Sequence, residues 1–158
     1  MMSKYNLQGF LKDFIGIILV IFQLLIISLH FIKFKFFHKI EIMQGNFIFS
    51  FLGLIVIIIA SIIMFLAIKD LGSNLSPFPR PIANGNLVTS GIYGFIRHPM
   101  YYSLIIISLG VFIINLSFYY LCLTISLTLV IKFKIILEEH YLYDKFKNYL
   151  FYKDKVKY

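Results

Sequence analysis

Met100 to Ile136 reads "MYYSLIIISLGVFIINLSFYYLCLTISLTLVIKFKII", two apolar runs that meet at the short polar stretch "INLS", Ile114 to Ser117. Asn and Ser are poorly suited to hydrocarbon but common in turns. The second run reaches a membrane-spanning length only if it includes Lys132 and Lys134, whose long side chains can extend to the lipid headgroups. The stretch therefore predicts two membrane helices that fold back on each other as a hairpin.

The composition places the whole chain in a membrane. Of its 158 residues, 60% are hydrophobic, against about 45–50% apolar residues in soluble domains. Two earlier runs, Phe14 to Ile32 and Phe47 to Ile68, match the roughly 20 residues needed to cross a bilayer. None of the runs shows the two-residue alternation of membrane strands. We expect one all-α integral membrane domain over residues 1–158. Its four transmembrane helices are predicted at about 14–32, 47–68, 100–114 and 116–136.

The basic residues indicate the topology. Of the 15 lysines and arginines, only Lys33, Lys35 and Lys39 lie between the first two spans. The others lie in the N-terminal tail, in the loop after the second span and from Lys132 onward, and four spans put these regions on one side. The positive-inside rule makes that side cytoplasmic, with both termini. Topology and anionic headgroups thus explain the net charge of +8, and no nucleic-acid partner is predicted.

The loop from Lys69 to His98 carries every proline except Pro99. Long loops of this kind in a small domain are usually functional or disordered, and the Tyr and Ile content argues against disorder. Pro99 is suited to the first position of a helix. Arg97 and His98 are therefore expected at a helix N-terminus, whose free N–H groups favour an anion.

The hairpin register brings an acidic pair to the same place. If the turn is centred near Leu116, His98 lies level with about Lys134, give or take a turn, and Glu138 and Glu139 follow one turn later. The loop and this pair would then form a site that is cationic on one side and anionic on the other, which suits a zwitterion. Because consecutive helix positions differ by about 100°, only one glutamate is expected to face the loop fully.

Two motifs, "LVTSGIYGFIRHPMYYS" and "EEHYLYDKF", resemble a known family. It comprises the integral-membrane methyltransferases related to isoprenylcysteine carboxyl methyltransferase and to the phospholipid N-methyltransferases. Its pattern is Gly-x-Tyr, three residues, Arg-His-Pro-x-Tyr, and downstream Glu-Glu-x-x-Leu. Here the pattern falls on Gly91, Tyr93, Arg97, His98, Pro99, Tyr101, Glu138, Glu139 and Leu142. The resemblance covers about Leu71 to Val156.

The resemblance implies S-adenosylmethionine as the methyl donor and S-adenosylhomocysteine as the product, bound on the cytoplasmic side within residues 71–156. The cytoplasmic loop and a C-terminal helix would form this cofactor site. It implies a lipid or lipidated small molecule as the acceptor, entering from the bilayer, in a bacterial inner membrane. The implied cofactor-binding residues are Gly91, Tyr93, Arg97, His98, Pro99, Tyr101, Glu138 and Glu139. Arg97 and Glu139 are the candidate catalytic residues, and no metal site is expected.

Each candidate also has a structural alternative. Glu138 lies four residues after Lys134, the spacing of an ordinary helix ion pair, and Arg97 could extend to the headgroups. A carboxylate acceptor needs no general base, which favours carboxyl O-methylation over phospholipid N-methylation. Two further classes stay open at this stage: an NADPH-dependent reductase of the sterol-reductase type, and a non-catalytic membrane protein that binds a partner through the loop.

Overall fold

The computed structural model describes residues 4–32 and 46–157, which form an antiparallel helical bundle without strands. Its helices are α1 (Lys4–Leu29), α2 (Phe47–Leu71), α3 (Pro99–Asn115), α4 (Phe118–Lys145) and the short α5 (Tyr149–Lys155). The helices α1, α2 and α4 are long and apolar enough to cross a membrane, and α3 is a shorter apolar helix. The predicted all-α architecture is confirmed. Three candidate spans agree with an integral membrane protein, and the count of four stays a prediction.

The predicted hairpin turn joins α3 to α4. Leu116 follows α3 in the left-handed conformation (φ 42°, ψ 47°), and its N–H donates to the Phe112 carbonyl at 2.7 Å. The Ser117 side chain then caps α4 by accepting from the Tyr119 N–H at 3.3 Å. The reversal therefore lies within the polar stretch from which it was predicted.

Small residues let α2 and α3 pack closely. Gly53, Ala60 and Ala67 are buried along α2, one every seven residues, and therefore share one face. A Cβ atom on Gly110 of α3 would lie 2.6 Å from Ile57 Cγ1 and 3.0 Å from the Gly53 carbonyl oxygen. Such close approach is typical of helix pairs in membranes. It makes α2 and α3 a tightly packed pair that carries the long loop at one end.

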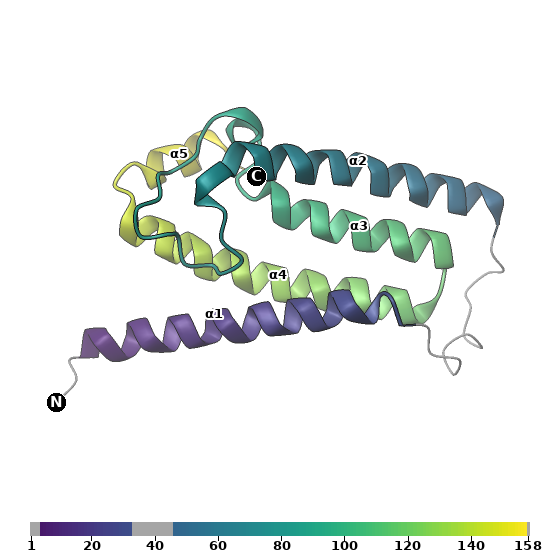
Figure 1. The fold of residues 1–158 in the computed structure, drawn as a ribbon, viewed down its shortest axis with the longest axis horizontal. Coiled ribbons are helices and arrows are strands. Elements are labelled where there is room, and N and C mark those ends of the chain that lie inside the picture. The colour runs from purple at the N-terminus through teal and green to yellow at the C-terminus, as the bar shows by residue number, and fades with distance from the viewer. Residues whose placement is uncertain (1–3, 33–45, 158) are drawn as a thin grey trace.

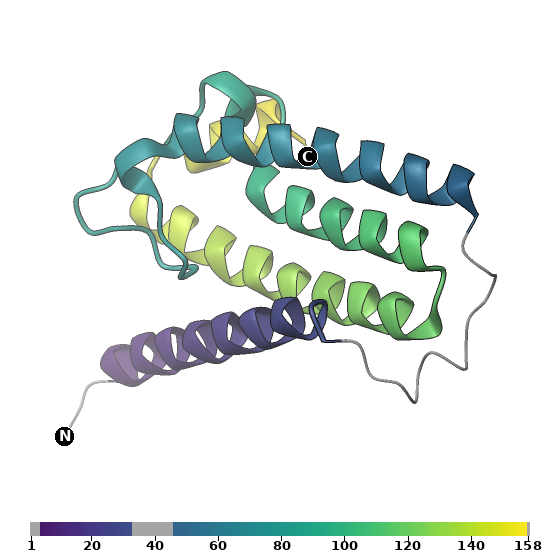
Figure 2. The same cartoon turned by 45° about the vertical axis from the view of Figure 1, so that its right-hand side comes forward.

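Buried apolar packing between α1 and α4 is concentrated at the end of the bundle away from the long loop. Ile26 of α1 belongs to a buried cluster with Tyr120, Leu123, Leu127 and Ile131 of α4. From there the two helices diverge toward the N-terminus of α1, as both views show (Figures 1 and 2). The bundle is therefore closed near the hairpin turn and more open near the long loop.

One end of the bundle gathers the segments that the charge distribution placed together. The N-terminus of α1, the end of α2, the start of α3, the end of α4 and α5 all lie there (Figure 1). The loop of residues 72–98 connects α2 to α3 at this end. That this end faces the cytoplasm stays a prediction. Residues 33–45, with Lys33, Lys35 and Lys39, lie outside the described residues.

The prediction for Lys134 was wrong. Its side chain does not extend to the headgroups: the residue is 2% exposed, and Nζ donates to Gln23 Oε1 at 2.6 Å and to the Pro77 carbonyl at 3.2 Å. Nζ also lies 5.0 Å from the centroid of the Tyr101 ring. The helical ion pair with Glu138 is absent among the described residues. Neighbouring chain segments supply acceptors inside the bundle, so the ammonium is satisfied without reaching the surface.

Candidate functional site

The site begins at Gly91, which fixes the loop to the end of α2. Gly91 has φ +60°, and a Cβ atom there would lie 2.0 Å from Asp70 Oδ2. The same Asp70 oxygen accepts from the Ile92 N–H at 2.8 Å. Only glycine fits this backbone and this contact. The 3-10 turn η3 (Gly91–Gly94) is thereby fixed to α2, and Tyr93 within this turn is buried.

An ion-pair cluster forms around Glu139. Its Oε1 lies 3.1 Å from Arg97 Nη2 and 3.4 Å from His98 Nε2, and its Oε2 lies 2.7 Å from Lys153 Nζ. The side chains of Arg97, His98 and Glu139 are 14%, 4% and 17% exposed. The structure thus brings these three predicted residues together. His98 meets Glu139 rather than lying level with Lys134, about one turn beyond the expected register.

Arg97 also holds α5 in place. Its Nη1 donates to the carbonyl oxygens of Val156 at 2.6 Å and Lys153 at 3.3 Å, at the C-terminus of α5. The Tyr152 hydroxyl donates to the Tyr93 carbonyl at 2.7 Å. Arg97 Nε is buried and has no hydrogen-bond partner among the described residues. The guanidinium therefore retains one donor that the protein does not use.

The tyrosines around this cluster keep their protons at neutral pH. Burial raises the pKa of Tyr152 to about 12. Burial, followed by the charge of Glu138, raises the pKa of Tyr93, and burial with the charge of Glu139 raises that of Tyr149. None of the three supplies a phenolate base near pH 7.

Glu138 has different surroundings from its neighbour. It is half-buried and accepts a hydrogen bond from the Tyr101 hydroxyl at 2.6 Å. The Tyr101 ring in turn stacks on His98, with 5.8 Å between ring centroids. Glu138 forms no ion pair among the described residues. The adjacent glutamates thus differ: Glu139 is paired with the cationic side chains of Arg97 and Lys153 and with the His98 ring, whereas Glu138 has no cation bound to it.

Glu138 lines a cavity of about 90 Å³ beside the loop. The cavity is also lined by residues 85–88, Tyr93, Arg97 and Phe146. Of the predicted cofactor-binding residues, Tyr93, Arg97 and Glu138 line this cavity. The remaining five, Gly91, His98, Pro99, Tyr101 and Glu139, lie behind it or beside it. The charged and aromatic residues around the cavity are chemically complementary to a cationic group, an anionic group and a flat ring.

Sequence reasoning missed several residues of the site. Lys153, the second cation on Glu139, lies beyond the end of α4, so no helical spacing connects the two. Asn74 Oδ1 accepts from the Asn86 N–H at 2.8 Å and holds together two parts of the loop that the sequence separates. Tyr149 and Tyr152 pack at the base of the site. A tyrosine-rich tail was the only signal for them, and it specifies no contact.

Comparison with known families adds an independent finding. The family model described as phospholipid methyltransferase matches residues 48–149. The match begins in α2 and ends at the first residue of α5, so it includes the loop and both motifs but not α1. No curated protein matches the chain.

Proposed function

The chain belongs to the phospholipid methyltransferase family, and we propose that it transfers a methyl group from S-adenosylmethionine to a membrane lipid. Membership itself indicates a membrane methyltransferase acting on lipids. The observation that carries the cofactor assignment is the pair of groups at the small cavity. Glu138 offers a carboxylate without a bound cation, and Arg97 offers a buried, unused Nε donor.

These groups fit the chemistry of the cofactor. The amino-acid end of S-adenosylmethionine has an ammonium, which Glu138 would bind, and a carboxylate, which Arg97 Nε would bind. The rings of Tyr93 and Phe146 offer flat apolar faces for the adenine. The cavity, about 90 Å³, is smaller than the roughly 300 Å³ or more of typical ligand sites. The loop segment from Ser76 to Val88 must therefore move outward to admit the cofactor.

When bound, S-adenosylmethionine supplies a methyl group activated by its sulfonium. The chain's own residues then position and orient, which is the main catalytic requirement of such a displacement. Tyr101 orients Glu138 through its hydroxyl, and Glu139 holds the Arg97 guanidinium at Nη2. Glu139 is therefore a positioning residue in this proposal, and Arg97 and Glu138 are the residues that touch the cofactor.

The acceptor we favour is a lipid carboxylate. It is already nucleophilic and needs no proton removed, and the buried tyrosines near the cavity remain protonated. A lipid amine is the second candidate, because the matching family model is that of phospholipid methyltransferases. A base would then have to take the proton of the lipid ammonium, whereas Glu138 is assigned here to the ammonium of the cofactor. The reductase alternative receives no support from the family match.

Methyl transfer can be tested with purified protein in detergent, a lipid extract and methyl-labelled S-adenosylmethionine. We expect a labelled lipid whose formation is lost in Glu138→Gln. Mild alkali distinguishes the two acceptors, since it cleaves a methyl ester and leaves an N-methyl group intact. Folded protein that neither labels a lipid nor binds S-adenosylhomocysteine would refute the proposal.

A further inference from the structure

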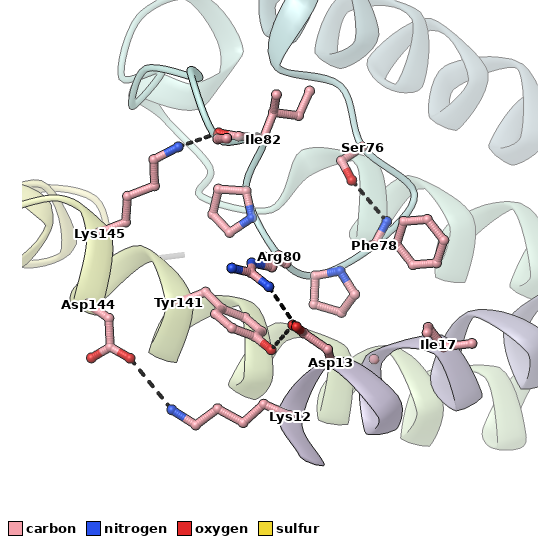
Figure 3. Close-up of a pocket in the computed structure, with 14 residues that line it drawn as sticks. Lys12, Asp13, Ile17, Ser76, Phe78, Arg80, Ile82, Tyr141, Asp144 and Lys145 are labelled. Carbon is pink, nitrogen blue, oxygen red and sulfur yellow. Dashed lines mark hydrogen bonds and ion pairs between the residues drawn. The ribbon is translucent and has the colours of Figure 1, made fainter. Parts of the chain in front are cut away.

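A second, larger cavity of about 640 Å³ lies where α1 and α4 diverge (Figure 3). Gly16 and Ile17 of α1 form one wall, the loop from Phe78 to Ala83 forms another, and Tyr141 near the end of α4 closes the third. Its size falls within the range of about 300–1,000 Å³ that is typical of ligand sites. Apart from its charged rim, its walls are mostly apolar.

Charged side chains surround the mouth of this cavity (Figure 3). Arg80 Nη1 donates to Asp13 Oδ2 at 2.6 Å, and the Tyr141 hydroxyl donates to Asp13 Oδ1 at 2.7 Å. Lys12 lies 3.5 Å from Asp144. With Lys145, which donates to the Ile82 carbonyl, the rim carries three cationic side chains against two carboxylates. Its net charge favours an anion.

The two cavities adjoin the same loop segment. Ser76 and the run from Phe78 to Ile82 line both of them. A ligand in the larger cavity would therefore contact the same loop segment that lines the small cavity beside Glu138. Two reacting molecules need this kind of adjacency.

We propose that the larger cavity binds the headgroup end of the lipid acceptor, with the Arg80 guanidinium on the lipid's oxyanion and the chain against Ile17. This rests on the proposed function. Both α1 and α4 are candidate membrane spans, so a lipid can enter sideways between them from the bilayer. The oxyanion can be a phosphodiester or a carboxylate, because a guanidinium binds either in a bidentate manner.

Arg80 is able to exchange its partner. Its side chain is 65% exposed, and exposed ion pairs contribute little to stability. If Arg80 turns to a lipid, Asp13 keeps its hydrogen bond from Tyr141. Asp13 thus competes with the lipid for Arg80. Because α1 lies outside the residues matched by the family model, this recognition would be a feature of this chain's own N-terminal helix.

The competition between Asp13 and the lipid for Arg80 predicts that substitutions of Arg80 and Asp13 change the KM for lipid in opposite directions. The KM for lipid is measured in detergent micelles with a glycerophospholipid amine and, separately, with an isoprenoid thioether carboxylate, and lipid retention is measured by native mass spectrometry. Arg80→Gln should raise the KM about 10-fold or more, since a charge-assisted hydrogen bond is lost. Asp13→Asn should lower it several-fold, which structural damage would not do.

A cavity-filling pair provides the steric control. Ile17→Trp should abolish lipid retention, whereas Ile21→Trp, one turn further along α1, exposed and outside the cavity lining, should leave it within about 2-fold. The lipid that responds to Arg80→Gln identifies the oxyanion. Retention of both lipids unchanged in Arg80→Gln and Ile17→Trp would overturn the inference, as would failure of the wild type to retain either lipid. Binding of S-adenosylhomocysteine, measured in parallel, reports on the proposed function separately.

Discussion

Replacing Glu139 by Gln should destabilise the end of the bundle that holds α5. The carboxylate pairs with Arg97 and His98, which are 14% and 4% exposed, and with Lys153, which is 43% exposed and adds little. Breaking a buried pair costs about 3–5 kcal/mol. In the variant, the side-chain amide oxygen of Gln can still accept one hydrogen bond, which reduces this cost. We therefore expect a loss of about 2–4 kcal/mol, or roughly 5–15 °C in unfolding temperature for a chain of this size.

The assay is thermal unfolding in detergent, combined with limited trypsin digestion at Lys153 and Lys155 of α5. In Glu139→Gln, trypsin should cleave α5 first. Glu139 pairs with Arg97, and Arg97 holds the carbonyl groups at the C-terminus of α5. The matched control is Glu138→Gln, which changes the neighbouring carboxylate and no ion pair. Unfolding of Glu139→Gln at the wild-type temperature, with α5 still protected, would refute this reasoning.

Three further predictions concern packing and protonation. Gly110→Leu should prevent α2 and α3 from packing and abolish the folded yield in detergent, whereas Gly9→Leu, with open space around it, should be tolerated. Gly91→Ala should cost more than the roughly 1–2 kcal/mol of a left-handed residue, because its Cβ also displaces Asp70. In the same unfolding assay, Gly94→Ala, whose Cβ would meet only a contact at 3.4 Å, should be nearly neutral. Because the pKa of Tyr152 is raised to about 12, its contribution to stability should be complete below its ordinary pKa of about 10 and be lost as pH rises toward about 12. Alkaline unfolding curves should show a smaller loss in Tyr152→Phe than in the wild type, because the raised pKa values of Tyr93 and Tyr149 still contribute in the variant.

The parts of the fold that depend on local sequence were predictable. The hairpin turn follows from "INLS" because Asn and Ser stand between two apolar runs. The start of α3 at Pro99 follows from the missing N–H of proline. The proximity of the loop to Glu138 and Glu139 follows from the register of the hairpin. An error of one helical turn in that register still leaves the loop close to these two residues.

The different surroundings of Glu138 and Glu139 were not predictable, because they depend on tertiary contacts. Which glutamate faces the ion-pair cluster depends on the rotation of α4 about its axis, and α3, α5 and the loop fix that rotation together. Lys134 looked like a headgroup lysine because the sequence does not reveal that Gln23 and the Pro77 carbonyl meet it inside the bundle. Predicting the cavity beside α1 likewise requires the angle between α1 and α4, which are far apart in sequence.

The most direct test of the central claim is equilibrium binding of S-adenosylhomocysteine to the purified protein by isothermal titration. The wild type should bind, and Glu138→Gln should bind about 10-fold or more weakly, with an unchanged unfolding temperature. A folded wild type that does not bind, or equal binding by Glu138→Gln, would contradict the assignment of the small cavity to the methyl donor.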